Sequence, residues 1–134
     1  MERKNVASGA RWEPIVGYSR AVRVGAYVAV AGTTATDPQG KVVSPGDPYG
    51  QAVHIFQRIE AALTQTGARL EDVVWTRIFL ANIADWEKVG RAHAEFFREI
   101  RPAATLVEVS RLIDPEALVE IEADAVLAPP VGNR

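Results

Sequence analysis

Three acidic residues near the C-terminal end alternate with apolar residues in a pattern that could support acid–base chemistry. The stretch Val119–Ala125 places Glu120, Glu122 and Asp124 between small or branched apolar residues. In a β-strand, alternate side chains point to opposite faces, so the carboxylates would share one face at spacings of about 7 Å. A carboxylate at a partly dry site can have a raised pKa and act as an acid or base. Because no histidine is near them, we expect no metal there, and we expect no cofactor.

The amino-acid composition excludes several classes of catalytic site, metal site and binding partner. The 134 residues include no cysteine and two histidines, which excludes thiol nucleophiles, disulfides and multi-histidine metal sites. Lysine plus arginine number 15 and aspartate plus glutamate 17, a formal charge of −2, so a basic nucleic-acid-binding surface is not expected. The first residues lack an apolar signal segment, and the longest uncharged apolar stretch, 25–36, is shorter than the roughly 20 residues that span a bilayer. We expect a cytoplasmic protein that binds neither nucleic acid nor membranes.

The elements that must position these acids are those of an α+β domain. The predicted elements are strands at 19–24 and 27–31, a helix at 48–66, a strand at 73–80, a helix from Asp85 to before Pro102, and strands at 103–111 and 118–127. The order β-β-α-β-α-β-β favours a mixed sheet with two helices on one face. Residues 1–13 are expected to form an irregular arm, 14–128 a single domain and 129–134 a tail.

The helix-free face of this sheet is expected to mix carboxylates with large apolar groups. It would carry Glu120, Glu122 and Asp124, with Leu106 and Glu108 from the preceding strand and Trp75, Arg77 and Phe79 from the middle strand. Such a mixture is more typical of a subunit interface than of a face in open solvent, so we expect a homo-oligomer. Arg77 is expected either to provide an anion site or to form a structural ion pair with the acidic strand.

Several spaced motifs resemble the RidA (YjgF) family. The matching stretches are Gly17–Val22, Ala31–Thr33, Gly67–Val74, Glu95–Phe97, Pro102–Val109 with Leu112, and Val119–Ala123, so the resemblance covers about residues 14–127. It implies a chorismate-mutase-like fold, a trimeric barrel of packed sheets, and small-molecule clefts between subunits. It also implies hydrolysis of imines and enamines, formed by pyridoxal-phosphate enzymes, to a 2-keto acid and ammonia.

The resemblance also assigns candidate site residues. Glu120 matches the family carboxylate that positions or activates water, and its alternative role is an ion pair with Arg77 or Arg111. Tyr18 matches a residue bordering the cleft. Gly32 and Thr33 match the loop that lines it, where Thr33 and backbone amides would stabilise an oxyanion.

One position departs from the family pattern. Deaminating members resemble a Pro-Ala-Arg-Ser sequence whose arginine holds the substrate carboxylate, whereas this chain has Ala104 at the arginine position. Alanine offers no bidentate grip on a carboxylate, so an altered specificity is expected. Leu106 is a further candidate substrate contact, and Trp12 is expected either to cover the cleft or to pack ordinarily.

Three functions remain open from the sequence. The first is a hydrolase or deaminase acting on imines, enamines or related small carbonyl metabolites, with Glu120 handling the water. The second is a small-metabolite binding protein without catalysis, using the same clefts. The third is RNA cleavage or translation inhibition, which the net charge of −2 disfavours.

Overall fold

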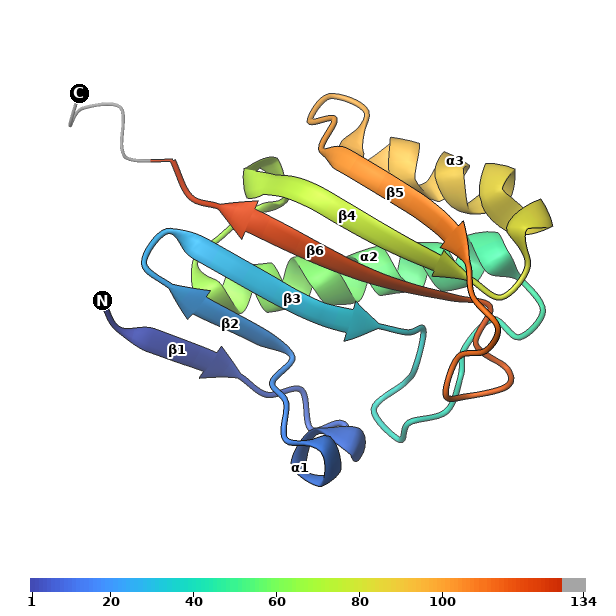
Figure 1. Cartoon of the computed structure of the whole chain (residues 1–134), viewed down its shortest axis with the longest axis horizontal. Coiled ribbons are helices and arrows are strands. Elements are labelled where there is room, and N and C mark those ends of the chain that lie inside the picture. The colour runs from blue at the N-terminus through green and yellow to red at the C-terminus, as the bar shows by residue number, and fades with distance from the viewer. Residues whose placement is uncertain (129–134) are drawn as a thin grey trace.

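All the predicted strands and helices are present, and they form one mixed sheet with two long helices on one face (Figure 1). The computed structural model describes residues 1–128, so the expected tail at 129–134 lies outside the described residues. The elements are β1 (Arg3–Val6), α1 (Trp12–Val16), β2 (Ala21–Val24), β3 (Tyr27–Thr33), α2 (Pro48–Thr66), β4 (Val73–Leu80), α3 (Trp86–Phe97), β5 (Ala103–Glu108) and β6 (Val119–Val126). The strand order is β1-β2-β3-β6-β4-β5, with β5 parallel to β4. Within residues 1–128, no helix is both long and apolar enough to cross a bilayer.

Helix α2 forms where the sequence predicts it, because both of its ends are capped. The Asp47 side chain accepts a hydrogen bond from the Gly50 amide at 3.0 Å, and Pro48 occupies the first turn. Gly67 ends the helix with a φ of 86°, a conformation that residues with a Cβ rarely adopt. The apolar face of α2 is fully buried at Ile55 and Phe56 and packs against the sheet.

Helix α3 begins differently from the prediction. In the described part of the chain, the Asp85 side chain makes no capping hydrogen bond. A single 3₁₀ turn, Ile83–Asp85, precedes the helix, and the Asn82 side chain accepts from the Ala84 amide at 2.9 Å. Asn82 rather than Asp85 therefore caps the N-terminal end of this helical segment, because the 3₁₀ turn places the first free amide groups near Asn82.

The N-terminal segment is not irregular throughout, contrary to expectation. Strand β1 pairs antiparallel with β2, with Arg3 opposite Val24 and Val6 opposite Ala21. Only Val6 of this strand is buried, at 5% exposed. A four-residue polar strand at a sheet edge shows almost no hydrophobic alternation, so its backbone pairing could not be predicted from pattern.

Strand β4 reverses the predicted orientation of its first two residues. Val73 is 3% exposed and Val74 is 46% exposed, whereas the simple alternation placed Val74 towards the helices. The register with β6 shifts between Val73 and Trp75, which leaves Val74 as an extra residue. This β-bulge moves the first residue inward and leaves Trp75 and Arg77 on the open face as predicted.

Strand β5 presents the opposite faces from those expected. Leu106 stands opposite the buried Ile78 in the parallel register and packs against the core. Leu106 and Glu108 therefore face the helix side, and Thr105 and Val107 face the open side. The sequence of β5 has no strong polar–apolar alternation, so the pairing with β4 decides its orientation.

A half-buried histidine joins the helix layer to the sheet. A ring nitrogen of His93 lies 2.9 Å from the Thr76 hydroxyl oxygen. The ring centroids of Phe56 and Phe97 lie 5.6 and 4.8 Å from that of His93. Burial lowers the pKa of His93, because the charged imidazolium is poorly solvated there.

This arrangement predicts an acid-sensitive fold. Since the folded pKa of His93 lies below the unfolded value of about 6.5, the unfolded chain binds the extra proton between the two values. The contribution of neutral His93 to the free energy of unfolding is therefore fully present above about pH 6.5 and is lost as the pH falls. The free energy of unfolding should fall by at most about 1.4 kcal/mol per pH unit on this account. Urea unfolding across pH 5–8 should show this slope in the wild type and a smaller one in His93→Gln. An equal slope in both would contradict it, and His54→Gln serves as the control.

Candidate functional site

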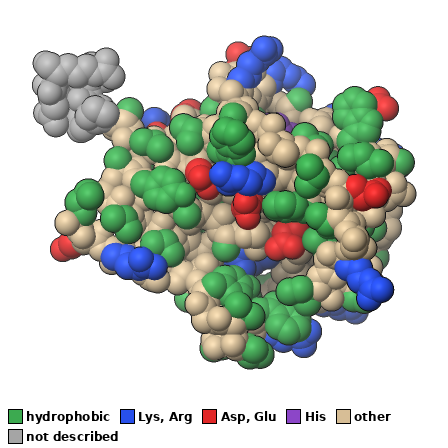
Figure 2. Space-filling model, in the orientation of Figure 1, with side chains coloured by type: hydrophobic (Ala, Val, Ile, Leu, Met, Phe, Trp, Pro, Cys, Tyr) green, Lys and Arg blue, Asp and Glu red, His purple; other side chains and the backbone are tan. Residues whose placement is uncertain are grey.

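Glu120, Glu122 and Asp124 form an acidic stripe on β6. This stripe lies on the open face of the sheet, as predicted, together with Arg77. The Arg77 Nη1 atom lies 3.3 Å from both Glu122 Oε1 and Asp124 Oδ1. The same guanidinium lies 5.3 Å from the centroid of the Trp75 ring. Figure 2 shows hydrophobic side chains spread over this face, with acidic and basic groups gathered near its middle. Arg77 is therefore engaged in an ion-pair cluster in which carboxylates outnumber the cation.

Glu120 differs from its two acidic neighbours. It makes no ion pair within 4.0 Å to any residue of the described chain, Arg77 and Arg111 included. Burial raises the pKa of Glu120, the charge of Arg20 acts in the opposite direction, and the charge of Glu122 adds to the increase. The Glu120 carboxyl group can therefore keep its proton at a higher pH than an ordinary glutamate side chain, as a general acid requires.

A β-bulge sets the backbone opposite this carboxyl group. Val30 pairs with Ala123 and Thr33 pairs with Ile121, so two residues of β3 stand opposite one of β6. The bulge turns Thr33 inward, where it is 0% exposed. It also brings Gly32 against Glu120, such that a Cβ on Gly32 would collide with the Glu120 carboxylate.

Arg20 is the residue that joins these parts. Its Nη1 atom donates to the Gly32 carbonyl at 2.7 Å and to the Thr33 hydroxyl at 2.9 Å. Its Nη2 atom donates to the Tyr18 hydroxyl at 3.3 Å. The Arg20 side chain is 6% exposed, so this polar network is buried. The Thr33 hydroxyl also donates to the Ala31 carbonyl at 2.8 Å, so within one subunit its hydrogen bonds belong to this network.

Two further charged residues surround Arg20 and were not predicted. Arg58 of α2 donates to the Thr34 carbonyl at 2.7 Å, and burial, followed by the charge of Arg20, lowers the pKa of Arg58. The Glu13 carboxylate lies 4.0 Å from Arg20 Nε and accepts from the Ser8 amide at 3.2 Å. Charged residues in short polar segments resemble surface residues, so the sequence carried no signal for this buried cluster.

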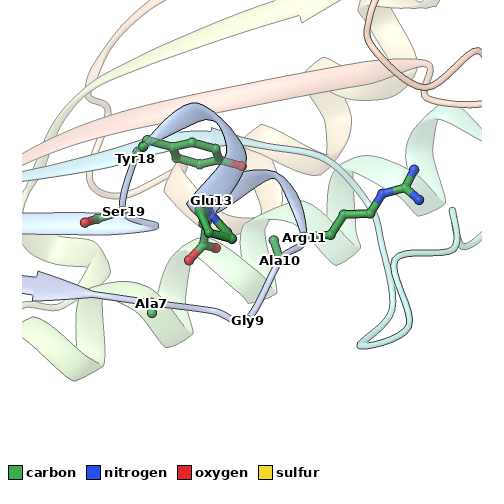
Figure 3. Close-up of a pocket in the computed structure, with 9 residues that line it drawn as sticks. Ala7, Gly9, Ala10, Arg11, Glu13, Tyr18 and Ser19 are labelled. Carbon is green, nitrogen blue, oxygen red and sulfur yellow. The ribbon is translucent and has the colours of Figure 1, made fainter.

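Two open cavities meet at Tyr18. One, of about 490 Å³, lies beside α1 and is lined by residues that include Ala10, Glu13, Pro14 and Tyr18. Tyr18 and Glu13 both face it, whereas the Arg11 side chain extends away (Figure 3). The other, of about 440 Å³, lies over the open face and is lined by residues that include Arg3, Tyr18, Ala31, Glu122 and Asp124.

The predicted site residues thus separate into two groups. Tyr18, Gly32, Thr33 and Glu120 are brought together around Arg20.

The other candidates lie elsewhere. Ala104 and Leu106 face the helix side of the edge strand β5, away from Arg77. Trp12 lies in α1, with the Arg11 guanidinium 4.4 Å from its ring centroid, and lines neither of the two cavities. Ala104, Leu106 and Trp12 therefore do not join the cluster within one subunit.

Comparison with known proteins identifies the class to which this fold and site belong. The profile of the family described as Endoribonuclease L-PSP matches residues 8–127. A crystal structure of Rv2704 from Mycobacterium tuberculosis, described as a member of the YjgF/YER057c/UK114 family, is 48% identical, with a TM-score of 0.86 over 94% of this chain and 100% of the other. The chain belongs to this family, in which RidA and YjgF proteins are grouped.

Two curated relatives differ in what their names state. The Streptomyces coelicolor protein SCO2049, called uncharacterized, is 41% identical over 91% of this chain and 90% of its own length. The 3-aminoacrylate deaminase RutC of Acinetobacter baylyi is 36% identical over 81% of this chain and 85% of its own length. Both relatives therefore agree with the family assignment, and the name of one of them states a deaminase activity.

The contact between Gly32 and Glu120 gives a testable prediction. Gly32→Ala should lower the free energy of unfolding by at most about 1 kcal/mol, because the added methyl group must displace the carboxylate, which is the mobile end of a flexible side chain. Gly90→Ala is the matched control, since nothing lies within 4 Å of its added Cβ and the helix should gain roughly 0.5–1 kcal/mol. Combining Gly32→Ala with Glu120→Ala should remove most of the loss in urea unfolding. Independent, additive effects would contradict the predicted contact.

Proposed function

We propose that this protein is a hydrolase that acts on small imines, enamines or related carbonyl metabolites. The observation that carries the proposal is Glu120, a half-buried carboxyl group of raised pKa that faces the bulged backbone at Gly32 and has no ion-pair partner among residues 1–128. Tyr18 lines both neighbouring cavities, and its hydroxyl belongs to the same network. The relative named 3-aminoacrylate deaminase supports this class of reaction.

The chemistry requires an acid and a base but no cofactor. Water adds to the carbon of a C=N bond, the nitrogen accepts a proton, and the resulting carbinolamine loses ammonia to leave a carbonyl group. Glu120 in its protonated form donates to the nitrogen, and in its ionised form it accepts a proton from the attacking water. The Tyr18 hydroxyl donates a hydrogen bond that orients the substrate.

The substrates should differ from those of relatives that bind a carboxylate. The 3-aminoacrylate in the relative's name is a carboxylate, and Ala104 cannot hold such a group. Arg77 does not replace the missing guanidinium, because Glu122 and Asp124 both engage it. An additional anion on this acidic face would be repelled, so we favour imines and enamines that are neutral or cationic.

We also propose that the protein is a homotrimer with ligand clefts between its subunits. Tyr27, Trp75, Val107 and Val126 all lie on the open face and are between 39% and 46% exposed. Apolar groups of this size, arranged around a charged cluster, are typical of a surface that another copy covers. Closing the sheets against one another would enclose the cavity that lies over the open face at Tyr18.

The hydrolase proposal predicts loss of activity in Glu120→Gln. Ammonia release from imines generated by an amine oxidase should fall by about 10² to 10⁴-fold, because the amide cannot exchange the proton. Imines of simple amines should be hydrolysed at least as well as those that carry a carboxylate. Glu108→Gln, which alters a carboxylate on the opposite side of β5, should retain activity.

Other outcomes of the assay distinguish the alternatives. If the wild type binds small carbonyl compounds in a thermal-shift experiment but accelerates no hydrolysis, the protein is a binding module. The family description names an endoribonuclease, yet the acidic open face and the net charge of −2 disfavour a phosphate backbone. Cleavage of RNA by the wild type that Glu120→Gln abolishes would replace the hydrolase proposal.

The trimer proposal is tested separately. Trp75→Glu should shift the protein from trimer to monomer in sedimentation equilibrium, because it places a charge within the apolar part of the face that another copy would cover. Trp86→Glu is the control: Trp86 is also exposed, at 54%, but lies on α3 in the helix layer. A wild-type monomer, or equal dissociation of both variants, would contradict the proposed interface.

A further inference from the structure

The β-bulge of β3 leaves backbone carbonyl groups without a partner in the sheet, and a side chain binds them. Two successive residues, Ala31 and Gly32, stand opposite one residue of β6, so their carbonyl groups do not both find ladder partners. Arg20 Nη1 donates to the Gly32 carbonyl at 2.7 Å and lies 3.4 Å from the Ala31 carbonyl oxygen. The Arg20 backbone binds the same segment, with the Ala31 amide donating to its carbonyl at 2.9 Å. Arg20 therefore fixes the conformation of the bulge from both its side chain and its backbone.

The same guanidinium fixes the hydrogen-bonding role of Tyr18. Arg20 Nη2 carries only donors, so the Tyr18 hydroxyl accepts at 3.3 Å. The guanidinium also lies 5.6 Å from the centroid of the Tyr18 ring, close enough for a favourable cation–π contact. Since its oxygen accepts from Arg20, the phenolic proton is available to an acceptor in one of the cavities that Tyr18 lines.

Arg20 is also the positive charge that acts on Glu120. The charged groups of the described chain that affect this carboxyl group are Arg20, which favours its ionised form, and Glu122, which opposes it. Glu122 is itself bound to Arg77 at 3.3 Å. Within residues 1–128, the Nε atom of Arg20 has no hydrogen-bond partner, and Glu13 is 4.0 Å away, so the positive charge of Arg20 is only partly compensated there.

We propose that Arg20 is the positioning residue of this site, which locks the Ala31–Gly32 bulge, directs the Tyr18 proton outward and supplies the charge that balances the half-buried Glu120. Arg20 does not touch the substrate, because its side chain is 6% exposed and packed behind these groups. The inference deepens the proposed hydrolase function and concerns the same site. Its first test needs no substrate, so it can succeed or fail independently of that function.

The test is an NMR titration of the Glu120 side-chain carboxyl carbon in the full-length protein. Arg20→Met removes the charge and the hydrogen bonds, so the midpoint for Glu120 should move to higher pH than in the wild type. Arg20→Lys keeps the charge but not the planar fork, so the midpoint should stay close to that of the wild type. The amide signals of Gly32 and Thr33 should shift in both variants, because neither can hold the bulge as arginine does.

Arg58→Met is the matched control. Arg58 is also a partly buried arginine, and it binds the next segment of the same chain region at the Thr34 carbonyl. Its loss should lower the melting temperature without moving the Glu120 midpoint. If Arg20→Met and Arg58→Met change this midpoint equally, or if neither changes it, Arg20 has no specific effect on Glu120 and the proposal fails.

The conservative variant keeps the proposal testable if Arg20→Met does not fold. In Arg20→Lys, unchanged amide signals at Gly32 and Thr33 would show that the bulge does not depend on the guanidinium, and this would overturn the positioning role. In the imine assay, Arg20→Lys should lower kcat by at least about 10-fold while the pH dependence of kcat keeps its wild-type midpoint. A change confined to the melting temperature would indicate a purely structural residue and would also overturn the proposal.

Discussion

Burying a guanidinium at the end of a sheet constrains everything around it. A charged group removed from water is costly unless its donors are bound and its charge is balanced. Arg20 meets most of this requirement with carbonyl, hydroxyl and phenolic oxygens drawn from Tyr18, Gly32 and Thr33. Because these oxygens belong to separate segments, the arginine holds the start of β2 and the end of β3 in one arrangement.

The site depends on this arrangement through the bulge. Without the extra residue in β3, Thr33 would point to the open face and Gly32 would not lie against Glu120. The bulge reverses this order, so that the hydroxyl enters the buried network and the residue lacking a side chain meets the carboxylate. The close approach desolvates Glu120, and burial is the largest cause of its raised pKa. The bulge in β3 therefore determines how far Glu120 is buried, and this burial in turn raises the pKa of Glu120.

The open face has a different physical role. Its centre is an ion-pair cluster of Arg77, Glu122 and Asp124, and its periphery carries partly exposed aromatic and branched side chains (Figure 2). A surface exposed permanently to water rarely gathers such groups over so small an area. The trimer proposed here would cover the apolar periphery and leave the acidic stripe beside the clefts, which explains how one sheet face can serve both assembly and binding.

The sequence by itself determined the elements with strong periodicity and clear ends, such as α2 between Asp47 and Gly67, and the shared face of Glu120, Glu122 and Asp124. These features follow from local backbone geometry, in which side-chain direction depends only on position along the chain. Tertiary structure alone decided the pairing of β1, the two bulges, the orientation of β5 and the buried role of Arg20. Each of these depends on hydrogen bonds between segments far apart in the sequence, and no local pattern records which distant carbonyl or carboxylate a side chain will meet.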